Sequence, residues 1–200
     1  MKREEKREHT KKLLLDTTKA LIQEKGCSQL TIADIMARSG LSKGAIFHYI
    51  RKKDELFTMV LQERLDDIHA RFTAAAQKEN ADLEGPLGEI VSSYSSLQDP
   101  DDVTNQIFIY LLGKSDMPEA AELTQSFYDE SVRLAKAWIL AGQNKGVIPS
   151  SVDADKTADL FVLISLGIRV RSTVSDRSFA FTNQDFAKLT KSMLKGQINE

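Results

Sequence analysis

Hydrophobic side chains recur every three to four residues over long stretches of this chain, and no stretch alternates regularly between apolar and polar positions. The first spacing is that of one face of a helix, and the second is that of a strand. Only four prolines and ten glycines occur, and several of them, such as Gly26, Gly40 and Gly146, fall between the helical stretches. The pattern therefore predicts an all-α chain of about nine helices.

The first two helices are expected before residue 40. The apolar spacing predicts a helix from about Thr10 to Lys25, and Gly26 supplies its stop. A short second helix should follow Thr31, because a threonine hydroxyl can cap the first turn of a helix.

Turn and capping residues separate the next helices. Gly40 permits a tight turn, and Ser42 is a plausible cap for a short third helix that runs through Tyr49. A long fourth helix is expected over residues 53–77. Five more helices are predicted beyond Asn80, at about residues 84–97, 101–114, 118–144, 153–174 and 184–197.

Caps and breaks mark the later helices as well. Pro118 suits the first turn of a helix, because its missing N–H would lack a partner there in any case. The segment from Gly146 to Pro149 should break the chain, and Asn183 can cap the last helix.

The charge of the chain is unevenly distributed. Residues 1–60 hold 13 Lys or Arg and 8 Asp or Glu residues, whereas the remaining residues hold 14 and 21. A basic first part joined to an acidic body is one indication of an anion-binding module, although solvated helices with chance clustering would give the same counts. No secretory signal or apolar run long enough to span a membrane is evident, so a cytoplasmic protein without a membrane partner is expected.

The sequence offers no arrangement of residues for catalysis or metal binding. His9 and His69 have no neighbouring nucleophile or carboxylate in a recognisable pattern, and Cys27 is more simply a small packing residue than a redox sensor. A Gly-rich phosphate loop is also missing. We therefore expect no enzyme, no cofactor and no metal.

One segment carries the functional signal. Residues 30–56 read LTIADIMARSGLSKGAIFHYIRKKDEL. Two short helices around a glycine turn, followed by a basic approach to another helix, have the spacing of a helix-turn-helix. We expect Ile35, Met36 and Ile46 to pack against the first helix. The remaining residues of the third helix would then be available to a DNA groove: Ser42, Lys43, Gly44, Ala45, Phe47 and His48.

This segment resembles the TetR family of bacterial transcriptional regulators. That family reads T-[IV]-x-x-[IL]-A-x-x-[AS]-G-[VL]-S-K-G-x-[LIV]-Y-x-[YH]-F-x-x-K-[DE]-x-L, and this chain matches at most of those positions over residues 10–57. The resemblance implies a three-helix DNA-binding domain at residues 1–55 and a larger helical domain for ligand binding and dimerisation at residues 56–200.

The resemblance also implies which residues meet DNA. Thr31 would offer its hydroxyl and backbone N–H to a phosphate, and Lys53 would pair with another phosphate. The third helix would enter the major groove. The implied DNA-binding residues are Thr31, Ser42, Lys43, Gly44, Ala45, Phe47, His48, Tyr49 and Lys53.

Two positions depart from the family pattern. Phe47 stands where a tyrosine is usual and so lacks a hydroxyl for a phosphate, and Ile50 stands where a phenylalanine usually packs. Base reading would rest on Lys43 and on apolar contact from Ala45. These departures keep an alternative open, in which the chain is a helical adaptor with a degenerate DNA-binding motif.

The second half contains aromatic residues on apolar helices. Each is most simply a core residue, but the resemblance implies a cavity for an apolar or amphipathic small-molecule effector. Arg169 and Arg171 could face a partner subunit, reach solvent or bind an anion. The candidate ligand-binding residues are Tyr94, Phe108, Tyr110, Phe127, Trp138, Phe161 and Arg169.

The last two helices carry apolar stripes that one subunit is not expected to bury fully, which favours a four-helix interface in a homodimer. The candidate interface residues are Phe161, Ile164, Ile168, Phe186, Leu189, Met193 and Leu194. The function predicted from the sequence is a ligand-responsive regulator, most simply a repressor, that binds a near-palindromic operator as a dimer. An activator is the nearest variant of this hypothesis.

Overall fold

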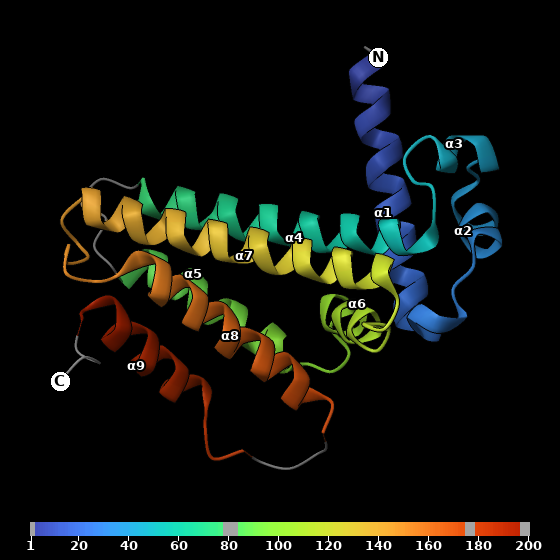
Figure 1. The fold of residues 1–200 in the computed structure, drawn as a ribbon. Coiled ribbons are helices and arrows are strands. Elements are labelled where there is room, and N and C mark those ends of the chain that lie inside the picture. Colours follow the sequence, from blue (N-terminus) through green and yellow to red (C-terminus); the bar gives the residue numbers. More distant parts are fainter. Residues whose placement is uncertain (1–2, 78–83, 175–178, 197–200) are drawn as a thin grey trace. The chain divides into compact units, whose positions relative to one another are not determined.

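The computed structural model describes residues 3–77, 84–174 and 179–196, and this part of the chain contains nine helices and no strand (Figure 1). The all-α prediction is confirmed. In chain order the helices are α1 (Arg3–Gln29), α2 (Ile32–Ser39), α3 (Lys43–Phe47), α4 (Lys53–Ala76), α5 (Glu84–Gln98), α6 (Val103–Leu112), α7 (Pro118–Asn144), α8 (Ala154–Ser172) and α9 (Asn183–Leu194). Among the described residues, no helix has both the length and the apolar character that crossing a membrane requires.

The chain divides into two compact units. Residues 1–64 and 101–125 form the first unit, and residues 65–100 and 126–200 form the second. The helices α4 and α7 each begin in the first unit and end in the second. The predicted functional boundary after residue 55 stays a prediction, because compactness alone does not locate a change of function.

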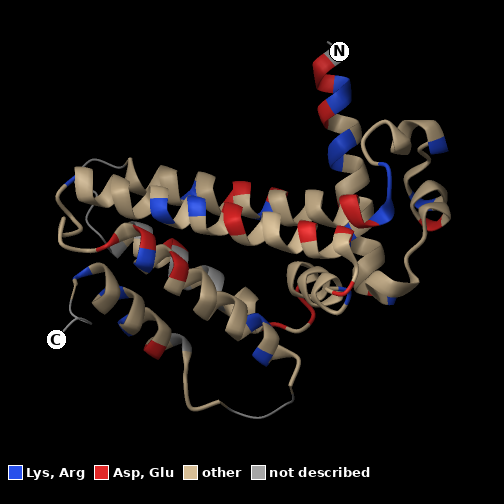
Figure 2. Ribbon diagram, in the orientation of Figure 1, with Lys and Arg blue, Asp and Glu red and all other residues tan. Residues whose placement is uncertain are grey.

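In the first unit, α1 packs against α2 and α6. Leu14, Ile22, Ile35 and Phe57 are almost fully buried in this unit, because the apolar face of each helix turns toward the others. Charged residues of both signs cover the exposed first turns of α1 (Figure 2). The predicted stop at Gly26 corresponds to a kink, where φ is 76°, and the helix continues to Gln29 beyond it.

In the second unit, α5 packs against α8 and α9, and α8 also packs against α9. One core cluster gathers around Ala135, Ile139 and Ala158, and another joins Leu97, Ile168 and Phe186. Apolar side chains from segments far apart in the sequence meet in both clusters.

Two of the three predicted signals in the later helices are confirmed, and one is wrong. Pro118 is the first residue of α7, and Gly146 has a positive φ of 73° in the break that follows that helix. The last helix is capped by Thr182 and not by Asn183. The reason is local, since Thr182 and Asp185 form a reciprocal pair in which each side chain meets the other residue's backbone N–H.

The predicted dimer residues need correction. Ile168, Phe186, Met193 and Leu194 are at most 7% exposed in the single chain, so their side chains already pack within it. Phe161, Ile164 and Leu189 are half-buried, and Phe161 and Ile164 pack against the cluster around Phe186. An apolar stripe shows that a helix face is covered, but it does not distinguish cover by the same chain from cover by a partner.

Candidate nucleic-acid interface

The start of α2 is fixed by a side-chain pair. The Thr31 hydroxyl accepts a hydrogen bond from the backbone N–H of Asp34 at 3.2 Å, and the Asp34 carboxylate accepts hydrogen bonds from the Thr31 backbone N–H at 2.8 Å and from its hydroxyl at 2.6 Å. The cap predicted at Thr31 is thus confirmed. Both groups that were expected to meet a phosphate are engaged with Asp34, so the first role of Thr31 is to hold α2 in place.

A salt bridge ties this cap to α1. The Lys25 ammonium lies 2.7 Å from the Asp34 carboxylate. The hydrogen bond from Lys25, followed by those from Thr31, lowers the pKa of Asp34 to about 2. The carboxylate is therefore ionised at neutral pH and stabilises the junction between α1 and α2.

The turn between α2 and α3 has the predicted chemistry. Gly40 ends α2 in the left-handed conformation at φ 70°, which a glycine adopts without steric strain. The Ser42 hydroxyl then accepts a hydrogen bond from the backbone N–H of Ala45 at 3.2 Å and caps α3. Both predicted signals are confirmed, although α3 ends at Phe47 instead of Tyr49.

One side of α3 is exposed to solvent. Lys43, Gly44, Phe47 and His48 are exposed, and Phe47 keeps 41% of its surface accessible. The Lys43 ammonium lies 5.7 Å from the centre of the Phe47 ring, which is within cation–π range. This face presents a cation, an aromatic ring and an imidazole to solvent on a helix held at both ends, which is the arrangement that a groove-reading helix requires.

Gly44 has no structural role that the fold explains. A Cβ atom added at this position would meet nothing within 4 Å. A glycine inside a helix is destabilising by about 1 kcal/mol relative to alanine. Its presence on the exposed face is explained if another molecule must approach the backbone there.

The residues that follow α3, Tyr49 and Ile50, contact other parts of the first unit. Tyr49 donates a hydrogen bond from its hydroxyl to the backbone carbonyl of Arg7 at 3.0 Å, and its ring meets His48 edge-on. Ile50 is only 2% exposed. The isoleucine therefore occupies the packing position where a phenylalanine is usual in the family.

Lys53 makes its contacts within the first unit in this structure, and its contact with a phosphate stays a prediction. Its ammonium donates hydrogen bonds of 3.0 Å to the backbone carbonyls of Cys27 and Leu30 and lies over the rings of Phe57 and Tyr110. The charge is thus used inside the unit, where it satisfies carbonyls at and just beyond the end of α1. We describe this contact as the Lys53 clamp. Burial raises the pKa of the neighbouring Cys27 thiol to about 11, so this thiol is protonated at neutral pH.

Two residues predicted for the ligand pocket lie elsewhere. Phe108 is 3% exposed in the first unit, and Tyr110 packs edge-on against Phe57 and donates to Asp54 at 3.2 Å. Lys114 also reaches Asp54, at 2.9 Å. The pattern Thr-x-x-Asp at residues 31–34 could have revealed the role of Asp34, but no sequence signal indicates the contacts of Asp54.

Two cavities of unequal size lie in the second unit. Phe161 and Trp138 line both, while Phe127 and Arg169 line only the larger one. These four predicted ligand residues thus meet at cavities. Tyr94 lies outside the described side chains.

Trp138, which lines both cavities, contacts two residues of α4. Its indole N–H donates to Nδ1 of His69 at 2.9 Å, and its ring stacks on Phe72 with centroids 4.7 Å apart. Nδ1 of His69 thus acts as the acceptor that orients this cavity wall.

Comparison with known proteins supports this description. Residues 14–60 match the family model of the bacterial regulatory proteins of the tetR family. The transcriptional repressor KstR2 of Mycolicibacterium smegmatis is 23% identical over 85 residues, and the matched region covers 42% of each chain. This relative therefore supports the DNA-binding end and not the whole chain.

Solved structures extend the similarity of fold. A TetR-family transcriptional regulator from Syntrophomonas wolfei is 16% identical and covers 96% of this chain and 98% of its own, with a TM-score of 0.73. SmeT, in its complex with triclosan, is 16% identical over 94% of this chain and 91% of its own, with a TM-score of 0.67. The family consists of DNA-binding regulators and not of enzymes. Residues 14–60 thus match the DNA-binding domain of the tetR family, and the chain as a whole shares the fold of solved regulators of that family.

Proposed function

We propose that this protein binds a near-palindromic operator as a homodimer, represses transcription and is released by a small apolar or amphipathic molecule. The exposed face of α3, from Lys43 to His48, is the observation that carries the DNA-binding part of the proposal. Lys43 would supply a phosphate or base contact, while Gly44 and Ala45 would let the backbone approach the groove. Such a protein acts where chromosomal DNA lies, in the cytoplasm.

An exposed apolar stripe on α8 supports the dimer. Leu160, Leu163 and Val170 are 40%, 58% and 40% exposed, and Gly167 lies between Leu163 and Val170 on the same face. Their spacing of three and four residues is that of a helix seam that packs against another helix. A second copy of this chain is the partner that fits, because two recognition helices must reach successive major grooves about 34 Å apart.

The ligand response would pass through α4. This helix begins at the Lys53 clamp and carries Phe72, which lines the smaller cavity, near its other end. A ligand that prefers one position of α4 would change the spacing of the two recognition helices and so weaken operator binding. SmeT, which shares the fold, was solved in complex with triclosan, and this supports a small-molecule effector for a chain of this kind.

Selection of bound sequences from a random DNA pool by the purified protein tests the proposal. The selected sequence is then titrated at two salt concentrations. A near-palindromic winner with steep salt dependence is the expected result, because phosphate contacts release counterions. No enrichment at low salt would contradict the proposal and favour a helical adaptor, and a reporter gene downstream of the winner would separate repression from activation.

A further inference from the structure

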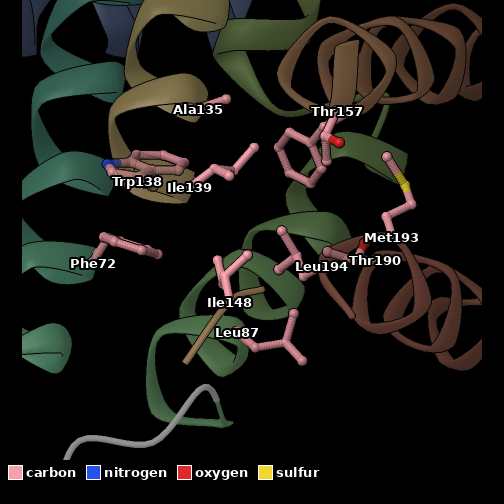
Figure 3. Close-up of a pocket in the computed structure, with 11 residues that line it drawn as sticks. Phe72, Leu87, Ala135, Trp138, Ile139, Ile148, Thr157, Thr190, Met193 and Leu194 are labelled. Atoms are coloured by element: carbon pink, nitrogen blue, oxygen red, sulfur yellow. The ribbon is translucent and has the colours of Figure 1, made fainter. Parts of the chain in front are cut away.

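The smaller cavity has an almost wholly apolar lining. Phe72, Trp138, Ile139 and Met193 are among its walls, and no lining residue is charged. Figure 3 shows Thr157 and Thr190 on the same side as Met193, across from Phe72 and Trp138. A charged ligand would lose its hydration in such a site without gaining a counter-charge, so the walls favour a neutral and largely apolar occupant.

Thr190 is the exception in this lining. Its side chain is 2% exposed, and its Oγ1 atom has no hydrogen-bond partner among the described residues. A buried polar atom without a partner is uncommon and destabilising. Its position in a cavity wall indicates that a bound molecule can supply the partner.

Other buried or half-buried hydroxyls in the helices of this protein donate a hydrogen bond to a backbone carbonyl of the preceding turn. Thr18 lies in α1 with 0% exposure, and its hydroxyl donates to the backbone carbonyl of Leu14, four residues earlier, at 2.8 Å. Ser131 and Ser165 make the same kind of bond. This bond is the ordinary solution for a hydroxyl inside a helix, and Thr190 leaves it unmade although it lies within α9.

We propose that the smaller cavity binds a neutral, mainly apolar molecule with one hydroxyl or carbonyl oxygen, and that this oxygen pairs with the Thr190 hydroxyl. The inference rests on the proposed function in so far as the occupant is the effector. Thr190 is then a specificity residue: it selects an oxygen-bearing ligand over a hydrocarbon of the same shape.

The larger cavity fits this ligand less well. Arg169 lines it and is buried, but its guanidinium lies 5.9 Å from the centre of the Phe127 ring and has further partners in the structure. The positive charge is thus already engaged within the protein. Thr190, by contrast, leaves its hydrogen-bonding capacity unused.

The first experiment measures thermal unfolding of Thr190→Val without ligand. Valine replaces the hydroxyl by a methyl group of similar size, so the buried polar atom disappears and the melting temperature should rise by about 2–4 °C. Thr18→Val is the matched control, since it removes a hydroxyl that has a partner, and its melting temperature should fall. A fall for Thr190→Val would show that the hydroxyl has a partner in the free protein and would overturn the proposal.

The second experiment measures binding by calorimetry with three probes of similar shape: 1-naphthol, 1-methylnaphthalene and 1-naphthoate. The unaltered protein should bind 1-naphthol about tenfold more tightly than 1-methylnaphthalene, and Thr190→Val should abolish this preference. The anion 1-naphthoate should bind most weakly. Tighter binding of 1-naphthoate, or a naphthol preference that survives in Thr190→Val, would contradict the proposal.

These outcomes can be distinguished from failure of the proposed function. A naphthol preference that depends on Thr190, together with operator affinity that naphthol does not change, would support the site and contradict its regulatory role. Selection of an operator without any binding of 1-naphthol would support the DNA-binding function and contradict the inferred ligand class.

Discussion

The α2–α3 segment and the cavities of the second unit are organised by different physical means. Thr31, Gly40 and Ser42 act within a few residues of their own positions, through caps and a positive φ. The cavity walls come from α4, α5, α7, α8 and α9 and from the segment after α7. Residues close in the sequence therefore determine the helix-turn-helix, whereas packing between distant segments determines the shape and chemistry of the cavities.

The largest effect is expected from the exposed stripe of the second unit. Replacing Leu163 by lysine places a charge where a partner should pack, so the protein should become monomeric and operator affinity should fall by about 100-fold or more, because the second half-site is lost. Light scattering after gel filtration and DNA-binding anisotropy measure both effects. Met117→Lys alters another exposed apolar residue, in the first unit, and should stay dimeric. A dimeric Leu163→Lys protein would contradict this assignment of the interface.

The next prediction tests whether the Lys53 clamp stabilises the fold. Lys53→Ala leaves the carbonyls of Cys27 and Leu30 without their donor, so the free energy of unfolding should fall by about 1–3 kcal/mol. Urea denaturation measures this change. Lys52→Ala removes an adjacent exposed cation, paired with Glu119, and should change stability by less than about 1 kcal/mol. Equal stability of the two variants would mean that Lys53 is a DNA contact and not a clamp.

Lys43 should show the opposite behaviour. Lys43→Ala removes an exposed charge on α3, so the melting temperature should stay nearly unchanged. The affinity for DNA should fall about three- to tenfold. The slope of log affinity against log salt concentration should become shallower by about 1, because one phosphate contact is lost. Titrations at several salt concentrations test this. Lys188→Ala changes an exposed lysine of α9 and should leave both quantities unaltered. Unchanged DNA binding by Lys43→Ala would favour the adaptor.

A smaller effect is expected at low pH. The pKa of Asp34 is lowered to about 2 in the folded chain, below its value near 4 in an unfolded chain, so ionisation of this carboxyl favours folding. The stabilisation is present above pH 4 and is lost as the pH falls toward 2. Asp34→Asn should be less stable than the unaltered protein at pH 6, and urea midpoints should show a smaller difference at pH 3.

Prediction from the sequence succeeded where the physical cause lies nearby. Thr31, Gly40, Ser42 and Pro118 all have the predicted roles in helix starts and stops, because caps and turns depend on adjacent backbone groups. The cap predicted at Asn183 was wrong because a reciprocal capping pair begins one residue earlier, at Thr182.

Prediction failed where the partner lies far away in the sequence. The ammonium of Lys53 meets carbonyls 23 and 26 residues earlier, and no local pattern in the sequence indicated these contacts. On α8, helical periodicity identified an apolar helix but not which of its faces the chain itself covers. Thr190 carries no sequence signal at all, since its property is a missing hydrogen bond.

The indole of Trp138 gives the protein a built-in optical reporter. It is the only tryptophan in the sequence, and it lines both cavities while it donates to His69. Its emission responds to local polarity and to quenching by a bound molecule, so occupancy of either cavity can be followed without a label. Libraries of candidate effectors can thus be screened on the unmodified protein by its own fluorescence, before any operator is known.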